Sequence, residues 1–260
     1  MTRLVFITGA SSGLGQAMAW EFYQAGYALA LVARNQAGLE RWVTEQGLDR
    51  QRYAIYRADV SLPQSIQAAA RQCLATQGVP DVVIANAGIS VGMDSGIAAD
   101  LDTMARIFAT NNLGMAATFQ PFIGPMRERA SGHLVGIASV AGIRGLPGHG
   151  AYCGSKAAVL AYCESLRGEL RGSGVKVQTI APGFIDTPMT RDNPYPMPFL
   201  MPAPRFARAA RRAIEGGSSY RVIPWQMAWV AKLLRVLPNA LFDAAFAGRG
   251  RKPRQTEPKA

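Results

Sequence analysis

The chain has 260 residues, of which 49% are hydrophobic and 17% are charged, and its net charge is +11. This composition suits a soluble fold with a large buried core and excludes an intrinsically disordered chain. The length fits one large α/β domain or two small ones, so it leaves the number of domains open.

The positive charge is concentrated near the end of the chain. Residues 205–260 contain 12 Lys or Arg and three Asp or Glu, a net charge of +9, which leaves the first 204 residues nearly neutral. A domain that binds nucleic acid would carry its basic residues across its own surface. The distribution therefore predicts a local role for the C-terminal region and no nucleic-acid partner for the domain.

The three cysteines, Cys73, Cys153 and Cys163, are odd in number and lack the spacing of metal ligands. We interpret them as free thiols of a reducing cytosol and expect no metal site. An apolar run at residues 4–7 leads directly into a glycine-rich loop, so the sequence shows no signal peptide. The expected location is cytoplasmic.

Short apolar runs alternate with helical patterns from residue 3 to residue 223. The expected strands are residues 3–8, 28–33, 53–58, 81–85, 133–138, 175–181 and 220–223. The expected helices are residues 13–25, a stretch ending near 46, 63–77, 101–129, 151–171 and 205–216. Such alternation produces a parallel sheet with helices on both faces, because each connection crosses over the sheet. The sequence predicts one α/β domain over residues 1–223, with a doubly wound Rossmann sheet of about seven strands.

A glycine-rich loop lies between the first expected strand and the first expected helix. Gly9 permits a tight turn, Gly13 lets the backbone approach a pyrophosphate, and Gly15 allows close packing of the helix. The N–H groups at the start of that helix, together with its dipole, favour phosphates. The loop therefore predicts a dinucleotide site, which also includes Ser11, Ser12 and Leu14.

Tyr152 and Lys156 are four residues apart, which places both side chains on one face of the helix expected at 151–171. A phenol has an unperturbed pKa of about 10 and is a poor acid at neutral pH. A neighbouring ammonium favours the phenolate, so we expect Lys156 to lower the pKa of Tyr152. A tuned phenol near a dinucleotide site is equipped to move a proton while the cofactor moves a hydride.

Five motifs together resemble the compact branch of the short-chain dehydrogenase/reductase family, over roughly residues 1–190. They are the loop Thr8–Gly15 with the spacing Gly-x3-Gly-x-Gly, Asn86-Ala87-Gly88, Ser139, Tyr152-x3-Lys156 and Pro182-Gly183. The extended branch typically shows Gly-x2-Gly-x2-Gly, which this chain lacks. The resemblance implies an oxidoreductase that interconverts a carbonyl and an alcohol with a nicotinamide cofactor and no metal.

The resemblance also implies a role for each of four residues. Tyr152 would be the general acid in reduction and the general base in oxidation. Lys156 would bind the nicotinamide ribose, and Ser139 would hold the substrate oxygen near the phenol. Asn111, three residues before a glycine as in relatives, would position a water that connects Lys156 to solvent.

The residue after the second strand usually decides between NAD and NADP, because a carboxylate there would repel a 2′-phosphate. This chain has Arg34 at that point and no acidic residue before Glu40, which favours NADP(H) over NAD(H). Many NADP-using relatives also carry a basic residue where this chain has Ser12, so the preference depends mainly on Arg34. A solvated arginine at a helix start is the alternative.

Three further segments are expected around the cofactor by the same resemblance. Asp59 and Val60 would contact the adenine, unless Asp59 is a plain loop acid that caps the next helix. Asn86-Ala87-Gly88 would pass beneath the adenosine ribose, or would form only a turn at the strand end. Residues after the sixth strand would surround the nicotinamide, or form a simple proline-glycine turn. They are Pro182, Gly183, Ile185 and Thr187.

Residues 187–204 are rich in proline and methionine. Relatives place a mobile substrate lid here, so we expect a lid within residues 187–216. Methionine and aromatic side chains would make this lid adaptable and apolar, which favours an apolar carbonyl substrate. Loop packing without substrate contact is the alternative.

Residues 224–260 form an apolar and basic extension that most compact relatives lack. The apolar run from residue 224 to residue 237 contains Lys232 and Arg235, so it is too short and too charged to span a bilayer. Three interpretations stay open: packing on the domain or on a second subunit, an interfacial helix on anionic lipid, and nucleic-acid binding by the tail. Family analogy adds a homodimer or homotetramer.

The leading hypothesis is an NADP-dependent reductase (EC 1.1.1.-) of a small apolar ketone or aldehyde, reversible toward alcohol oxidation. One alternative is a catalytically silent NAD(P)-binding regulatory protein, against which the complete set of four catalytic residues argues. Another is a membrane-surface reductase of lipid-like carbonyls, which the lid and the extension would serve together.

Overall fold

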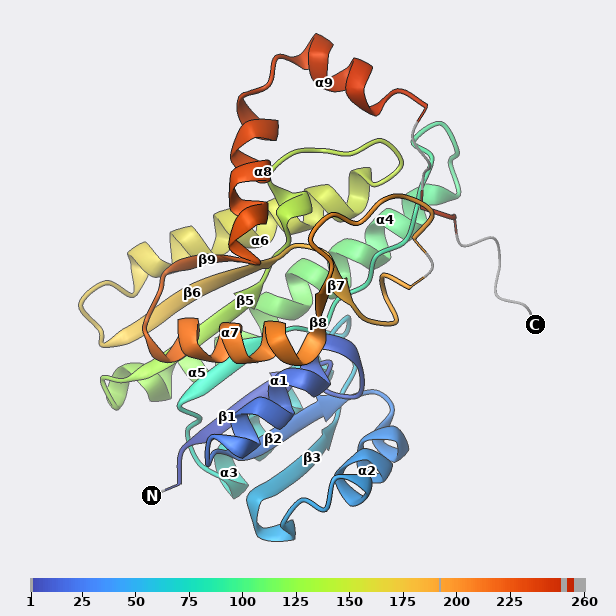
Figure 1. The fold of residues 1–260 in the computed structure, drawn as a ribbon. Coiled ribbons are helices and arrows are strands. Elements are labelled where there is room, and N and C mark those ends of the chain that lie inside the picture. Colours follow the sequence, from blue (N-terminus) through green and yellow to red (C-terminus); the bar gives the residue numbers. More distant parts are fainter. Residues whose placement is uncertain (1, 192, 249–251, 255–260) are drawn as a thin grey trace.

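The computed structural model describes residues 2–191, 193–248 and 252–254. Seven strands, all parallel, form one sheet in the order β3-β2-β1-β4-β5-β6-β9. The strands are β1 (Leu4–Thr8), β2 (Ala28–Ala33), β3 (Tyr53–Arg57), β4 (Val82–Ala85), β5 (Gly132–Ile137), β6 (Val175–Pro182) and β9 (Tyr220–Ile223). The chain reverses its direction of travel across the sheet between β1 and β4, so the predicted doubly wound fold is confirmed (Figure 1).

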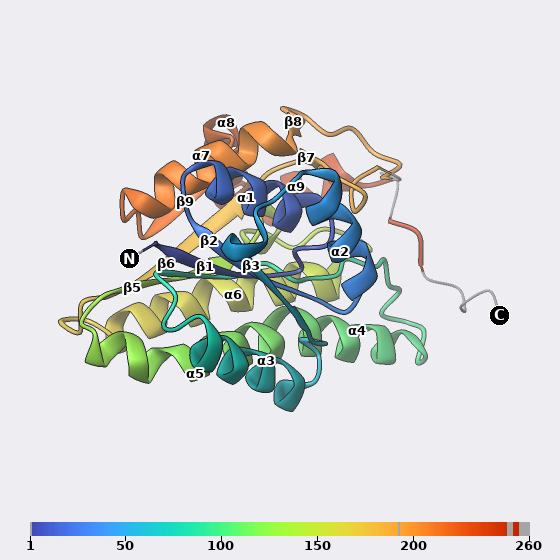
Figure 2. The same ribbon diagram turned by 90° about the horizontal axis from the view of Figure 1, so that it is seen from below.

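Helices cover both faces of the sheet (Figure 2). One face carries α1 (Gly13–Gln24), α2 (Gln36–Glu45) and α7 (Ala203–Glu215). The other face carries α3 (Pro63–Thr76), α4 (Asp100–Phe108), α5 (Gly114–Glu128) and α6 (Gly150–Glu169). Successive residues of a strand point to opposite faces, so Phe6 belongs to one core and Ile7 to the other.

The predicted helix at 101–129 is wrong in one respect. A π-helical turn, Ala109–Leu113, separates α4 from α5. A π-turn holds one residue more than an α-turn and commonly marks a functional site. It contains Asn111, whose amide is held by Ile89 and Ser155.

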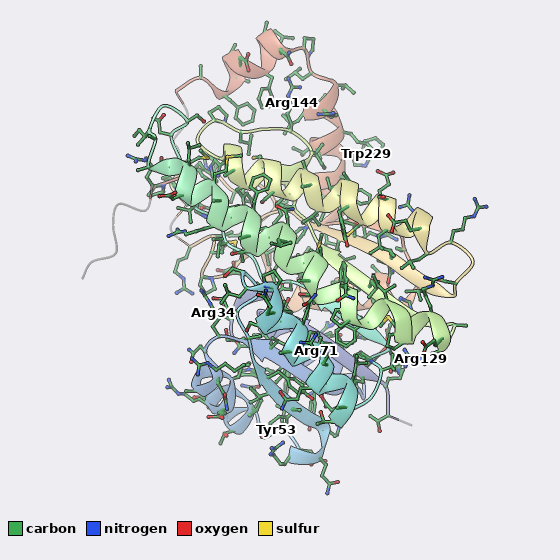
Figure 3. The ribbon with its side chains drawn as sticks, turned by 180° about the vertical axis from the view of Figure 1, so that it is seen from behind. Arg34, Tyr53, Arg71, Arg129, Arg144 and Trp229 are labelled. Atoms are coloured by element: carbon green, nitrogen blue, oxygen red, sulfur yellow. The ribbon has the colours of Figure 1, made fainter. Side chains whose placement is uncertain are left out.

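The C-terminal extension forms two helices, α8 (Trp225–Val236) and α9 (Asn239–Phe246), beyond β9 (Figure 1). On α8, Met227 is buried in the same core as α3, α5 and α6. Arg144 joins both helices to the domain, since it donates to the carbonyls of Leu234 and Leu237 and lies 4.0 Å from the ring centre of Phe242 (Figure 3). The extension therefore packs on its own domain. Among the described residues, no helix has the length and apolar character needed to cross a bilayer.

Residues 252–254, here called the C-terminal strap, return to the loop after β4. The Arg254 guanidinium lies 2.7 and 2.8 Å from the two carboxylate oxygens of Asp100, which is only 6% exposed. Gly92 forms a parallel bridge with Arg254 and donates to the carbonyl of Pro253 at 3.2 Å. The Lys252 ammonium donates to Ser90 Oγ and to the carbonyl of Met189, at 3.2 and 3.1 Å. The strap thus ties this loop to the segment after β7 (Ile185–Asp186). That short strand pairs with β8 (Met201–Pro202).

Candidate active site

The glycine-rich loop has the backbone conformation that the sequence predicted. Gly9 and Gly13 have φ angles of +67° and +54°, a region that side chains other than glycine rarely adopt. A Cβ at Gly15 would lie 2.1 Å from the carbonyl oxygen of Gly9, so α1 begins in direct contact with the loop. The Thr8 hydroxyl accepts from the N–H groups of Asn86 and Ala87, both at 3.1 Å, which joins the ends of β1 and β4.

A cleft of about 1100 Å³ lies along the carboxyl ends of the strands. All the predicted site residues except Gly15 and Asn111 line it. They are Gly9, Ser11, Ser12, Gly13, Leu14, Arg34, Asp59, Val60, Asn86, Ala87, Gly88, Ser139, Tyr152, Lys156, Pro182, Gly183, Ile185 and Thr187. Open backbone at the start of α1, two glycines with positive φ and a cleft of this size fit a dinucleotide.

Asp59 and Arg34 lie together at one end of this cleft. Their closest charged atoms are 3.8 Å apart, and the Arg34 side chain is 74% exposed. Asp59 accepts hydrogen bonds from the N–H and the hydroxyl of Ser61, at 2.9 and 2.7 Å. The N-cap residue of α3 is Leu62, and no side chain caps the helix there. Burial alone would raise the pKa of Asp59, but these hydrogen bonds and Arg34 lower it overall. The alternative in which Asp59 caps α3 is therefore wrong.

The catalytic candidates meet at the middle of the sheet. Tyr152 and Lys156 lie on one face of α6, with the Lys156 ammonium 5.8 Å from the centre of the phenol ring. The ammonium donates to the carbonyl of Ile137 at 2.8 Å, which anchors it to the end of β5. Ser139 follows β5, is only 7% exposed and accepts from Ala141 N–H at 3.1 Å.

The prediction that Lys156 lowers the pKa of Tyr152 is wrong for this structure. Burial raises the pKa of Tyr152 to about 12, and a hydrogen bond with Ser139 opposes this only in part. Burial also lowers the pKa of Lys156 to about 8, so the lysine is a weaker positive neighbour than one in solvent. At neutral pH the phenol therefore keeps its proton, and it is a weaker acid than a phenol in solvent.

Asn111 lies behind the cleft and is 2% exposed. Its amide donates to the carbonyl of Ile89 at 3.0 Å and to Ser155 Oγ at 2.9 Å, and its oxygen accepts from Ile89 N–H at 2.9 Å. A Cβ on Gly88 would lie 3.1 Å from the Asn111 oxygen and 3.6 Å from the Lys156 nitrogen. Asn111 and Lys156 therefore both lie close to Gly88.

The pKa of Lys156 makes a prediction for stability. Its value is lower in the folded chain (about 8) than the ordinary 10.5, so between these pH values the unfolded chain binds more protons. The contribution of Lys156 to stability therefore rises with pH in that window and is smallest below pH 8. Relative to Lys156→Met, the free energy of unfolding of the native chain should gain about 2 kcal/mol between pH 7 and pH 9.5. Urea unfolding at both pH values measures this, and a parallel pH dependence of the two proteins would contradict it.

A second cavity of about 390 Å³ adjoins the cleft. Ser139 and Tyr152 line both spaces, so the two cavities meet at the catalytic candidates. The rest of its wall is mainly apolar and comes from the loop after β5, the lid segment and the extension. Examples are Leu146, Phe184, Tyr195, Met227, Leu234 and Phe246.

Several residues of the second cavity were not predicted as site residues. Ser90 lies in an irregular loop without a recognisable motif, and Tyr195 is one aromatic residue within a proline-rich stretch. Arg144 and Lys252 line the cavity because the extension folds back over it. His149 lines it too, packs its ring 5.6 Å from that of Tyr195, and has a pKa lowered by burial and by Lys252. Only the basic, apolar composition of residues 224–260 signalled a special role for that segment.

Residues 3–196 match the family model of the short chain dehydrogenases, which is about three quarters of the chain. The chain belongs to the short-chain dehydrogenase/reductase family. It is therefore an oxidoreductase of that family. An uncharacterized oxidoreductase of Myxococcus xanthus is 37% identical over 243 residues, which are 94% of this chain and 96% of that protein. Dehydrogenase/reductase SDR family member 7B of Mus musculus is 37% identical over 190 residues, 71% of this chain but only 58% of that protein.

Solved structures of the family have the same fold. A short-chain dehydrogenase/reductase from Burkholderia phymatum in complex with NAD superposes with a TM-score of 0.81, at 25% identity over 100% of this chain and 98% of that one. ElxO with bound NADP has a TM-score of 0.77 at 22% identity, over 86% of this chain and 97% of that one. These two neighbours hold different nicotinamide dinucleotides in the same fold.

Proposed function

We propose that this short-chain dehydrogenase/reductase reduces an apolar ketone or aldehyde with NADPH, reversibly. One observation carries the proposal: Tyr152 and Ser139 line both the dinucleotide cleft and the apolar cavity. A carbonyl group at this junction would face the cofactor on one side and the phenol on the other. The nicotinamide dinucleotide supplies the hydride in reduction and accepts it in oxidation.

The protein's own residues would handle the proton and the position of the carbonyl. The phenol of Tyr152, protonated at neutral pH, donates its proton to the carbonyl oxygen as negative charge develops there. The Ser139 hydroxyl holds the same oxygen. Lys156 would hold the nicotinamide ribose through its ammonium, and Asn111 would hold a water beside Lys156 that returns the proton from solvent.

The remaining cleft residues would hold the dinucleotide. The loop Gly9–Gly15 would take the pyrophosphate, with α1 supplying N–H groups. Asp59 and Val60 would contact the adenine, and Asn86-Ala87-Gly88 would pass beneath the adenosine ribose. Residues 182–187 would surround the nicotinamide, with Thr187 near its carboxamide.

Arg34 supports NADP(H) as the preferred cofactor, because its exposed guanidinium at the adenosine end can pair with a 2′-phosphate. Arg34→Asp should reverse the preference, lowering kcat/KM for NADPH at least tenfold relative to NADH, since a carboxylate repels that phosphate. Steady-state kinetics with both cofactors measure the ratio. Arg57→Asp is the matched control: this exposed arginine lies outside the cleft lining and should leave the ratio unchanged. If the ratio of kcat/KM for NADPH to that for NADH were unaltered in Arg34→Asp, Arg34 would not be the source of a preference for NADP(H).

The second cavity supports an apolar substrate. We propose that the part of residues 187–216 before α7 acts as its lid, because Met189, Tyr195 and Pro198 line the wall and the strap holds Met189, whereas α7 packs in the core. Closure over such a wall would exclude water from the hydride transfer. The direct test is a panel of aliphatic and aromatic ketones and aldehydes, followed through the loss of NADPH absorbance. NADPH binding without turnover of any member would favour a silent regulatory protein instead.

We further propose a cytoplasmic homodimer or homotetramer as the working form. The structure has free, buried thiols at Cys73, Cys153 and Cys163, which supports a reducing compartment. Family analogy supports the oligomer, and its mass in solution can be measured by light scattering.

A further inference from the structure

Helix α8 is apolar on two opposite sides. Its inner side faces the domain, where Met227 and Ala231 are each only 4% exposed. Its outer side carries Trp225, Trp229, Leu233 and Val236, which are 66, 66, 64 and 76% exposed. The 3.6-residue period places these four side chains on one stripe, here called the outer face of α8 (Figure 3 labels Trp229).

Two tryptophans exposed on neighbouring turns are unusual for a surface that contacts only water. Contiguous exposed apolar side chains mark contact sites, because removing them from water is favourable. The rest of α8 contains the basic residues Lys232 and Arg235 and no acidic residue. The Lys232 ammonium lies 5.1 Å from the centre of the Trp229 ring, so positive charge borders the apolar stripe.

These features select the partner. Tryptophan prefers the interface between lipid and water, and basic residues around it are attracted to anionic headgroups. A second copy of the chain fits less well, because a twofold contact through this face would bring the Lys232 and Arg235 groups of both copies together. The net charge of +9 on residues 205–260 also favours an anionic partner.

We propose that the outer face of α8 is a docking surface for an anionic lipid bilayer, on which the helix lies flat. Leu241 of α9, the next helix of the extension, is a further exposed apolar side chain, at 59%. The opposite side of α8 lines the second cavity with Met227, Val230 and Leu234. One helix would thus separate the lipid from the proposed substrate cavity, which suits apolar carbonyls dissolved in a membrane; this last point rests on the proposed function.

The test is flotation of the full chain with vesicles of phosphatidylcholine alone or mixed with phosphatidylglycerol. We expect the native chain to float with the anionic vesicles at low salt and to dissociate as salt rises. Lys232→Gln should lower the partition constant about fivefold. Trp225→Ser combined with Trp229→Ser should lower it at least tenfold, and should also remove the blue shift of tryptophan emission on binding.

Two controls make the result decisive. Leu101→Ser removes an equally exposed apolar side chain (62%) from α4 and should bind vesicles like the native chain. Tyr152→Phe should also bind normally, so a failure of the proposed chemistry would not affect this readout. Absence of vesicle binding, or equal loss in Leu101→Ser, would overturn the proposal. So would a dimer that the double tryptophan variant dissociates while the native chain ignores vesicles.

Discussion

Replacing Tyr152 by phenylalanine should lower kcat for carbonyl reduction by roughly 10²- to 10⁴-fold. The phenol is the one proton donor proposed at the junction of the cleft and the cavity, and its pKa of about 12 keeps it protonated throughout the neutral range. Phenylalanine retains the ring that packs there and removes only the hydroxyl. NADPH affinity, measured by fluorescence titration, should change little, because the proposed cofactor contacts depend mainly on the glycine loop and Lys156.

Tyr195→Phe provides the matched control. It deletes the same hydroxyl from a tyrosine that lines the second cavity but not the cleft. This variant should keep most of its kcat and alter mainly KM. If Tyr152→Phe turned over at the native rate, or if both variants lost the same share of kcat, the phenol of Tyr152 would not be the acid.

Gly15→Ala should abolish tight cofactor binding and destabilise the fold by about 1–3 kcal/mol. The new Cβ would lie 2.1 Å from the backbone carbonyl oxygen of Gly9 and 2.6 Å from the side-chain nitrogen Nδ2 of Asn86. The first contact is with backbone, so the loop itself must move, and with it the N–H groups proposed to hold the pyrophosphate. Urea unfolding gives the stability, and NADPH titration gives the affinity.

A glycine-to-alanine substitution in an open part of a helix tests whether the effect at Gly15 comes from steric conflict. Gly168 lies within α6, and a Cβ there would have no heavy atom within 4 Å. Gly168→Ala should therefore stabilise the chain by about 0.5–1 kcal/mol, because alanine loses less backbone freedom on entering a helix. A Gly15→Ala protein as stable and as tightly bound to NADPH as the native chain would show that the helix can withdraw from the loop.

Local patterns predicted much of the fold. Buried parallel strands such as Val5–Ile7 are short apolar runs bounded by glycine, and their alternation with helical stretches left few topologies to consider. The π-turn at Ala109–Leu113 could not be predicted, because residues 101–129 read as one helical stretch. The turn depends on tertiary partners, since the amide of Asn111 is held by Ile89 and Ser155.

The candidate site also has parts that local sequence patterns predicted and parts that they did not. Most predicted site residues follow strand ends at motif spacings, and all of them except Gly15 and Asn111 line the cleft. The pKa of Tyr152 was predicted in the wrong direction, because the expectation counted a charged neighbour and not the burial that both groups undergo. Of the second cavity, the sequence indicated only the lid segment that contains Tyr195; the other walls were missed because they come from segments far apart in sequence, such as Leu146 and Phe246.

The contact between Gly92 and the C-terminal strap has a consequence for comparing family members. A Cβ at residue 92 would lie 2.0 Å from the carbonyl oxygen of Lys252, so only glycine lets the strap approach this loop. A homologue with a larger residue at the equivalent point must direct its terminal segment elsewhere and expose the acid corresponding to Asp100. Glycine and aspartate eight residues apart, with an arginine near the carboxyl terminus, thus form a three-point signature for recognising this tethered arrangement in a protein known only from its gene.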